Sequence, residues 1–260
     1  MRSCALHRFF REPSYYWAVK KIKVLSILVV SLVAAMTRAL AQQPAKPAPT
    51  AAELKKNFAR IERGTEGESA AFDKLTATTA RQLVAYLKTH EVSAAAAKNL
   101  GLDLSIDSHD AAHFKVFTYS YASGGTRGTV HRTVFQWQNQ TGKLFAYSFG
   151  EEGALGELYK MPSPGRTQYL LLGNERGSGI CERAIAFLVE LKGDYLLLDK
   201  QAFANKPTLD ICNTEFSYDA RQQALVVVAD STFGDPDVYA DTPFQPFKLY
   251  FSQGRFVKNK

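Results

Sequence analysis

The chain has 260 residues, a formal net charge of +7, three cysteines and 12% aromatic residues. This composition excludes a disordered, collagen-like or disulfide-dense protein. Residues 1–41 contain seven Lys or Arg and one acidic residue, so residues 42–260 carry 25 basic against 24 acidic residues and a net charge of +1. Nucleic-acid binding is therefore not expected, because it needs a clustered basic surface.

Residues 1–41 are predicted to be a signal peptide. A lysine-rich stretch precedes an apolar run of 13 residues at 24–36, and Ala39-Leu40-Ala41 is typical of a cleavage site. The run is shorter than the ~20 residues of a membrane-spanning helix. We expect cleavage before Gln42, export to the periplasm or the extracellular space, and no stable membrane anchor afterwards. An uncleaved signal anchor is the alternative.

Two cysteines, Cys181 and Cys212, follow the predicted cleavage site, since Cys4 is removed with the signal. An exported chain enters an oxidising compartment, and two cysteines close one bridge. The sequence therefore predicts a Cys181–Cys212 disulfide. A reactive thiol pair is disfavoured because redox motifs hold their cysteines two residues apart, and two free buried thiols are the other alternative.

The first part of the exported chain is predicted to be a linker followed by helices. Residues 42–49 alternate proline with small residues and read as an extended spacer. Thr50 and Glu53 have the spacing of a helix capping box. Residues 50–100 are assigned to a helical segment, with one long or two short amphipathic helices at 69–89, whose apolar face is expected to pack on the sheet that follows.

Residues 101–260 are predicted to form an antiparallel β domain. Residues 110–260 contain 23 aromatic residues whereas residues 42–109 contain three, and Gly-containing turns separate the β-rich runs. Ten short strands without helical crossovers indicate an α+β fold in which a meander closes as a barrel, a sandwich or a propeller-like array. The expected strands are 102–106, 114–121, 129–137, 144–149, 168–172, 184–191, 195–198, 224–229, 247–251 and 256–257.

The stretch from Ser108 to Trp137 resembles an uncharacterised family of exported bacterial β-rich proteins. That family has a Tyr-Ser-Trp-Asp motif followed by Gly-Gly-Thr-Met, and the counterparts here are the four residues from Tyr119 and the four from Arg127. The likeness extends over residues 95–258. It implies export and a β-rich fold, and it implies no activity. Tyr121 and Ala122 depart from the motif.

Histidines and a carboxylate gather in one segment and suit zinc. His109, Asp110 and His113 lie in a predicted turn, and His131 follows on the next predicted strand. Polar turn residues without a metal are the alternative interpretation. A metal-dependent hydrolase using His109, His113 and His131 as ligands, with Asp110 or Glu152 as base, is the enzymatic hypothesis.

Asp235 and Asp237 lie with two further aspartates in a loop that could hold calcium through carboxylate oxygens. The spacing does not match an EF-hand, and a solvated loop is the alternative. No cofactor is otherwise expected.

No catalytic motif is complete, so a non-enzymatic binding or interaction module is the leading hypothesis. Its expected partner is an extracytoplasmic protein or a glycan. Exposed aromatic residues would provide the contact surface, because aromatic faces bury much area at low entropic cost. The candidates are Tyr119, Tyr121, Trp137 and Tyr147, and packing in the core of the sheet is the alternative interpretation.

Overall fold

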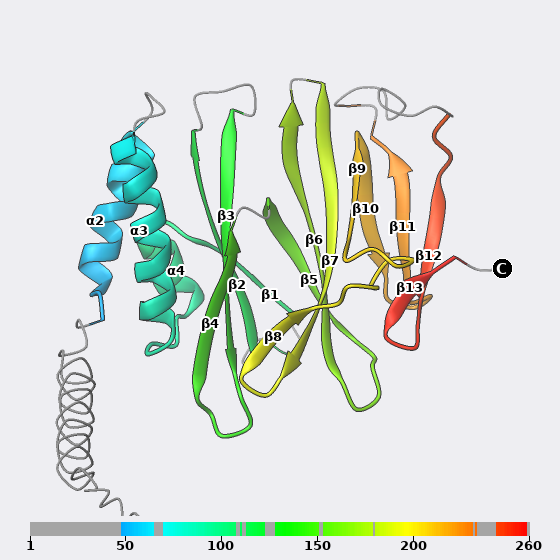
Figure 1. Cartoon of the computed structure of the whole chain (residues 1–260), viewed down its shortest axis with the longest axis horizontal. Helices are drawn as coiled ribbons and strands as arrows, with labels where there is room; N and C mark the ends of the chain where they lie inside the picture. Colours follow the sequence, from blue (N-terminus) through cyan, green and yellow to red (C-terminus); the bar gives the residue numbers. More distant parts are fainter. Residues whose placement is uncertain are drawn as a thin grey trace, which may run out of the picture. The chain divides into compact units, whose positions relative to one another are not determined.

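A computed structural model gives the fold (Figure 1). It describes residues 48–64, 70–107, 110, 113–122, 128–150, 153–178, 180–230, 232 and 243–258. These residues belong to one compact unit that begins at Ala48. Within these ranges three helices precede thirteen strands along the chain, which confirms the expected α+β, β-rich class.

The helices are α2 (Ala51–Arg63), α3 (Ala70–Leu87) and α4 (Ala94–Leu100). The expected capping box begins α2: the Glu53 amide donates to Thr50 Oγ1 over 3.2 Å, and the Thr50 amide donates to Glu53 Oε2 over 2.7 Å. No helix in the described ranges is long and apolar enough to cross a membrane. The apolar faces of these helices are instead buried against a sheet.

All strand pairs are antiparallel, and they form three sheets of consecutive strands. Sheet A has the order β1-β2-β3-β4, sheet B has the order β5-β6-β7-β8 with β9 also paired to β7, and sheet C has the order β10-β11-β12-β13. In the described part of the chain none of them closes into a barrel. The bounds are β1 Asp103–Ile106, β2 Phe114–Ala122, β3 Thr129–Gln138, β4 Leu144–Gly150, β5 Ala154–Met161, β6 Thr167–Ser178, β7 Cys181–Lys192, β8 Tyr195–Leu198, β9 Thr208–Cys212, β10 Thr214–Asp219, β11 Ala224–Ala229, β12 Phe247–Ser252 and β13 Arg255–Val257.

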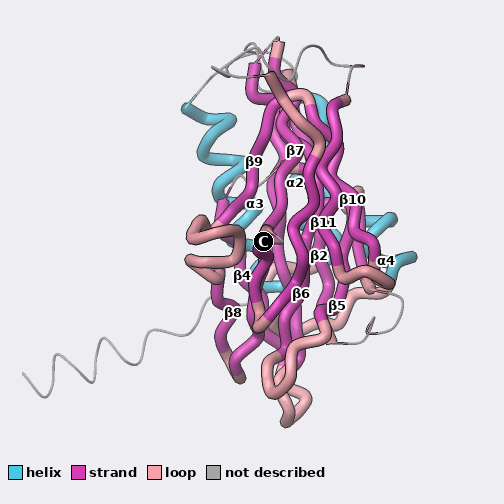
Figure 2. The backbone as a smooth tube through the Cα atoms, turned by 90° about the vertical axis from the view of Figure 1, so that its right-hand side faces the viewer, coloured by secondary structure: helices cyan, strands magenta, loops and turns pink. Residues whose placement is uncertain are grey.

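The helices and the three sheets are stacked in layers, with the helices on sheet A, sheet A on sheet B and sheet B on sheet C (Figure 1). Figure 2 looks onto the stack from the sheet C side, with the helices behind. A separate apolar core fills each of the three interfaces. Leu83 and Phe117 belong to the first core, Phe135 and Leu171 to the second, and Leu188 and Phe256 to the third.

Strand β2 shows how the sequence specifies this stacking. Phe114 and Val116 pack in the core toward sheet B, whereas Phe117 and Tyr119 pack in the core toward the helices. Successive side chains of a strand point to opposite faces. A strand that is covered on both faces therefore needs apolar residues on both, and β2 has them on both faces.

Three strands were not expected from the sequence: β5, β9 and β10. Gly156 interrupts the apolar pattern of β5, and only Asn213 separates β9 from β10. Asn213 makes that one-residue connection with a φ of 51°, a conformation for which Asn is suited. Strand β6 also extends to Ser178, beyond the expected end at Leu172.

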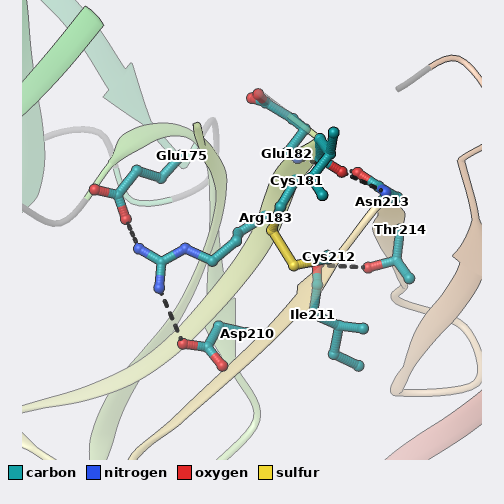
Figure 3. Close-up of a disulfide and its surroundings, with 10 residues drawn as sticks. Glu175, Cys181, Glu182, Arg183, Asp210, Ile211, Cys212, Asn213 and Thr214 are labelled. Carbon is teal, nitrogen blue, oxygen red and sulfur yellow. Dashed lines mark hydrogen bonds and ion pairs between the residues drawn. A yellow bond between two sulfur atoms is a disulfide. The ribbon is translucent and has the colours of Figure 1, made fainter. Parts of the chain in front are cut away.

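The expected disulfide between Cys181 and Cys212 is present, with a Cα–Cα distance of 5.1 Å (Figure 3). It links the start of β7 to the end of β9. Next to it the Asn213 amide donates to the Glu182 carbonyl over 2.6 Å, and the Glu182 amide donates to Asn213 Oδ1 over 3.0 Å. The bridge therefore stabilises the point where the chain passes from sheet B to sheet C.

Candidate functional site

A cavity of about 410 Å³, lined mainly by polar residues, lies at the end of sheets A and B where β2 begins and β3 ends. We call it the Asp110 pocket. It is formed by the segment before β2, the β3–β4 turn, the facing ends of β5 and β6, and the β7–β8 turn. Its lining residues are Asp110, His113, Gln138, Asn139, Gln140, Gly142, Lys160, Thr167, Tyr169, Leu191 and Gly193.

The carboxylate of Asp110 is the centre of this pocket. It is buried, and three side chains donate hydrogen bonds to it. His113 Nδ1 lies 2.8 Å from Oδ1, Lys160 Nζ lies 2.9 Å from Oδ2, and the Tyr169 hydroxyl donates to Oδ2. A buried charge is stable only when it is paired and hydrogen bonded, and these three donors meet that requirement.

The network keeps Asp110 ionised. Burial alone would raise its pKa, but the hydrogen bonds from Tyr169, Lys160 and His113 together with the charge of Lys160 outweigh burial, so the net effect is a lowered pKa. The pKa of Tyr169 is strongly raised, first by burial and then by the bond to Asp110. Tyr169 therefore remains a protonated donor at all physiological pH values.

Backbone hydrogen bonds hold the segment that carries Asp110 and His113. The Asp110 amide donates to the Asp107 carbonyl, and the His113 amide donates to the Asp110 carbonyl, each over 3.1 Å. Asp107 Oδ2 in turn accepts from the Lys160 amide over 2.6 Å. The bond between Asp107 and Lys160 therefore ties the segment before β2 to β5. It also brings the Lys160 side chain to Asp110.

The imidazole of His113 faces solvent on its outer side. Its side chain is 63% exposed although its Nδ1 is engaged by Asp110. Because a carboxylate accepts but does not donate, Nδ1 carries the proton, and in the neutral ring Nε2 is left as an acceptor. In the neutral ring, Nε2 is therefore the nitrogen that can accept a hydrogen bond from a molecule in the pocket.

The β3–β4 turn forms one wall of the pocket. Asn139 Oδ1 accepts from the Thr141 and Lys143 amides, each over 3.0 Å, and Asn139 Nδ2 donates to Asp194 over 2.9 Å. Trp137 Nε1 donates to the Gly193 carbonyl over 3.3 Å. These bonds join the β3–β4 and β7–β8 turns into one rim.

The other candidate metal ligands do not join Asp110 and His113 in the described part of the chain. Ser120 pairs with His131 across the β2–β3 ladder. Ser120 is seven positions beyond His113, about 23 Å along an extended strand. No group of three or more His, Cys, Asp or Glu in the described ranges is close enough to hold a metal ion. His109, Glu152, Asp235 and Asp237 lie outside the described residues.

His131 instead forms a pair with Ser120 beside a second, smaller cavity. Ser120 Oγ and His131 Nδ1 are 2.7 Å apart. Burial lowers the pKa of His131, against the opposing effects of Glu175 and Asp103. Ser120 lines a cavity of about 320 Å³ between α2, α4 and β2, which we call the helix pocket. Its lining also includes Lys55, Phe58, Glu62, Lys98, Asn99, Leu100 and Tyr119.

Two of the four residues expected to form an aromatic contact surface, Tyr119 and Trp137, are buried. Tyr119 is 3% exposed and packs edge to face on Phe58, and Trp137 is 4% exposed and lies in the core between sheets A and B. Tyr121 is half-buried against the helices, while Tyr147 is 49% exposed. Both β2 and β3 are covered on two faces, which is why their aromatic residues are core residues.

Sequence reasoning missed Lys160 and Tyr169, which complete the site. Tyr169 is 59 positions from Asp110, so no local motif joins them. One signal was present: Tyr169 lies in the run Tyr169–Leu172, and a tyrosine inside a buried strand needs a partner for its hydroxyl. The sequence does not identify that partner.

No family model matches this chain, and no curated protein or solved structure matches it. Any assignment of function therefore depends on the geometry of the Asp110 pocket.

Proposed function

We propose that the protein is an exported binding module and that its ligand is a neutral, hydroxyl-rich molecule such as a glycan. Export is supported by the predicted signal peptide, by the resemblance to exported bacterial β-rich proteins and by the Cys181–Cys212 disulfide. The face-to-face packing of the sheets favours a sandwich or a propeller-like array over a barrel among the closures considered.

The observation that carries the proposal is the chemical character of the Asp110 pocket. Asp110 and Lys160 form an ion pair inside it, so their charges cancel. Most other lining side chains are neutral hydrogen-bonding groups, including the amides of Gln138 and Gln140 and the hydroxyl of Thr167. A surface that offers many neutral donors and acceptors on a fixed frame is suited to hydroxyl groups.

The charge balance also argues against charged ligands. An anion would approach Lys160 but would lie next to the Asp110 carboxylate, and a cation would meet the opposite conflict. Asp110 is a poor site for a cation, because Lys160 already balances its charge and three donors occupy most of its acceptor sites. A neutral ligand avoids both penalties.

The test is a titration of the full-length, isotope-labelled protein with neutral oligosaccharides: cellotetraose, maltotetraose and chitotetraose. We expect saturable amide shifts at residues 138–142 and 191–193 with at least one of them, and a weaker affinity for Gln140→Ala. Asn99→Ala, which removes an amide from the helix pocket, is the matched control and should bind like the wild type. Absence of binding to all three, or shifts confined to the helix pocket, would refute the proposal.

A further inference from the structure

The Asp110–His113 pair has a geometry that binding alone does not require. In a binding site the buried Asp110 carboxylate must have hydrogen-bond donors. Binding does not require that one of these donors is an imidazole whose side chain is 63% exposed. In such a pair the carboxylate fixes the ring orientation and the tautomer, and the outer nitrogen accepts a proton from a molecule in the pocket. The pocket is large enough to hold a water molecule beside a ligand.

We propose that the Asp110 pocket hydrolyses carboxylic esters carried by its ligand, such as O-acyl groups on a glycan, with His113 as general base. Asp110 is the positioning residue, and Lys160, which is paired with it, is the only Lys or Arg in the described lining. This inference rests on the proposed ligand site and adds an activity to it.

The reaction balances without any other reactant. His113 Nε2 takes a proton from water as the water oxygen bonds to the ester carbon, and the carbonyl π pair moves to oxygen, where neutral donors of the lining such as the Gln140 amide stabilise the negative charge. The bond from carbon to the alcohol oxygen then breaks, and that oxygen takes the proton from His113. One ester and one water give one carboxylic acid and one alcohol.

The lining groups favour an ester over other hydrolysable bonds. Cleavage of a glycosidic bond uses two carboxyl groups facing the substrate, and the described lining contains a single carboxylate, Asp110, whose oxygens are occupied. A phosphate group would need several cations or a metal, and Lys160 is the single Lys or Arg in that lining. An ester needs a base, water and hydrogen-bond donors for the developing negative charge, all of which the pocket can supply.

His90 is a matched control for the role of the carboxylate at His113. His90 is also exposed, but its Nδ1 lies 2.8 Å from Thr89 Oγ1 and 3.2 Å from the Tyr86 carbonyl, with no carboxylate bond of its own among the described contacts. Its ring stacks on Tyr86 at 4.2 Å. A non-specific imidazole reaction would depend on His90 as much as on His113.

The experiment measures hydrolysis of 4-nitrophenyl acetate and glucose pentaacetate by the full-length protein. We expect saturation kinetics, a fall in kcat of at least about 100-fold in His113→Ala, and recovery of activity in that variant when free imidazole is added. Asp110→Asn should lower kcat with little change in KM, because its NH2 group can donate to Nδ1 and so removes the preference for one tautomer. His90→Ala should keep wild-type activity.

The outcomes separate this inference from the binding proposal. Oligosaccharide binding without ester cleavage overturns the esterase and leaves the binding module. If the wild-type protein neither binds the oligosaccharides nor cleaves the esters, both proposals are overturned. Cleavage that does not saturate, or that His113→Ala and His90→Ala reduce equally, overturns the role of His113. Circular dichroism and thermal midpoints of each variant identify a loss of activity that comes from misfolding, and His113→Gln, with a similar polar side chain, then replaces His113→Ala.

Discussion

Removing the Tyr169 hydroxyl tests how much the Asp110 network contributes to stability. Tyr169 is fully buried and donates to a carboxylate that is 6% exposed. A hydrogen bond to a charged group contributes about 2 kcal/mol, so we expect Tyr169→Phe to lower the free energy of unfolding by about 2 kcal/mol at pH 7. For a domain of this size the thermal midpoint should fall by about 4–8 °C.

The loss should depend on pH in a defined direction. The folded-state pKa of Asp110 is lowered, so its ionisation stabilises the fold above the ordinary carboxyl pKa of about 3.9, and that contribution disappears as the pH falls through the folded-state value. The difference between wild type and Tyr169→Phe should therefore be constant above about pH 5. In acid this difference in the free energy of unfolding should fall to about 1 kcal/mol, because a neutral hydrogen bond remains.

Urea unfolding followed by circular dichroism measures both effects. Tyr159→Phe is the matched control, because the Tyr159 hydroxyl also donates to a carboxylate, that of Glu157, but at an exposed site. We expect that control to change the free energy of unfolding by less than about 0.5 kcal/mol. A similar loss in both variants, or a Tyr169→Phe loss that does not vary with pH, would refute the reasoning.

Three further predictions concern the rest of the chain. Replacing Cys181 and Cys212 by serine should cost about 4 kcal/mol by the chain-entropy model for a separation of 31 residues; urea unfolding checks this, and a cost below about 1 kcal/mol would contradict it. Gly153→Ala should be clearly more destabilising in thermal unfolding than Gly142→Ala, because both have positive φ but only at Gly153 would a Cβ lie 2.6 Å from Ile185 Cδ1; equal effects would show that the close approach is unimportant. Mass spectrometry of the exported protein should find its N-terminus at Gln42, and an intact residue 1–41 segment would instead support a signal anchor.

The sequence predicted what local patterns encode. The Thr50–Glu53 capping box, the helical character of residues 69–89 and most hairpins follow from short-range spacing, and the structure has them. The disulfide followed from counting two cysteines. Strands β9 and β10 were missed because a single Asn with positive φ replaces the Gly-containing turn that would have marked their boundary.

The site was predicted only in part, because it is assembled over long range. Asp110 and His113 were identified since they are neighbours in the chain, but Lys160 and Tyr169 come from β5 and β6 in another sheet. Tyr119 and Trp137 were candidates for an exposed binding surface because aromatic faces suit binding, and the sequence does not show which aromatic residues lie in a core. Here sheet A is covered on both sides, so that expectation was wrong for these two residues.

The central claim is that buried Asp110 fixes the tautomer of His113 inside a polar pocket. The most direct test is long-range ¹H–¹⁵N NMR of the histidine side chains in the full-length protein, which reports which ring nitrogen carries the proton. The account predicts that neutral His113 is protonated at Nδ1, and that Asp110→Asn removes this preference. A His113 ring protonated at Nε2, or a tautomer unchanged in Asp110→Asn, would contradict it.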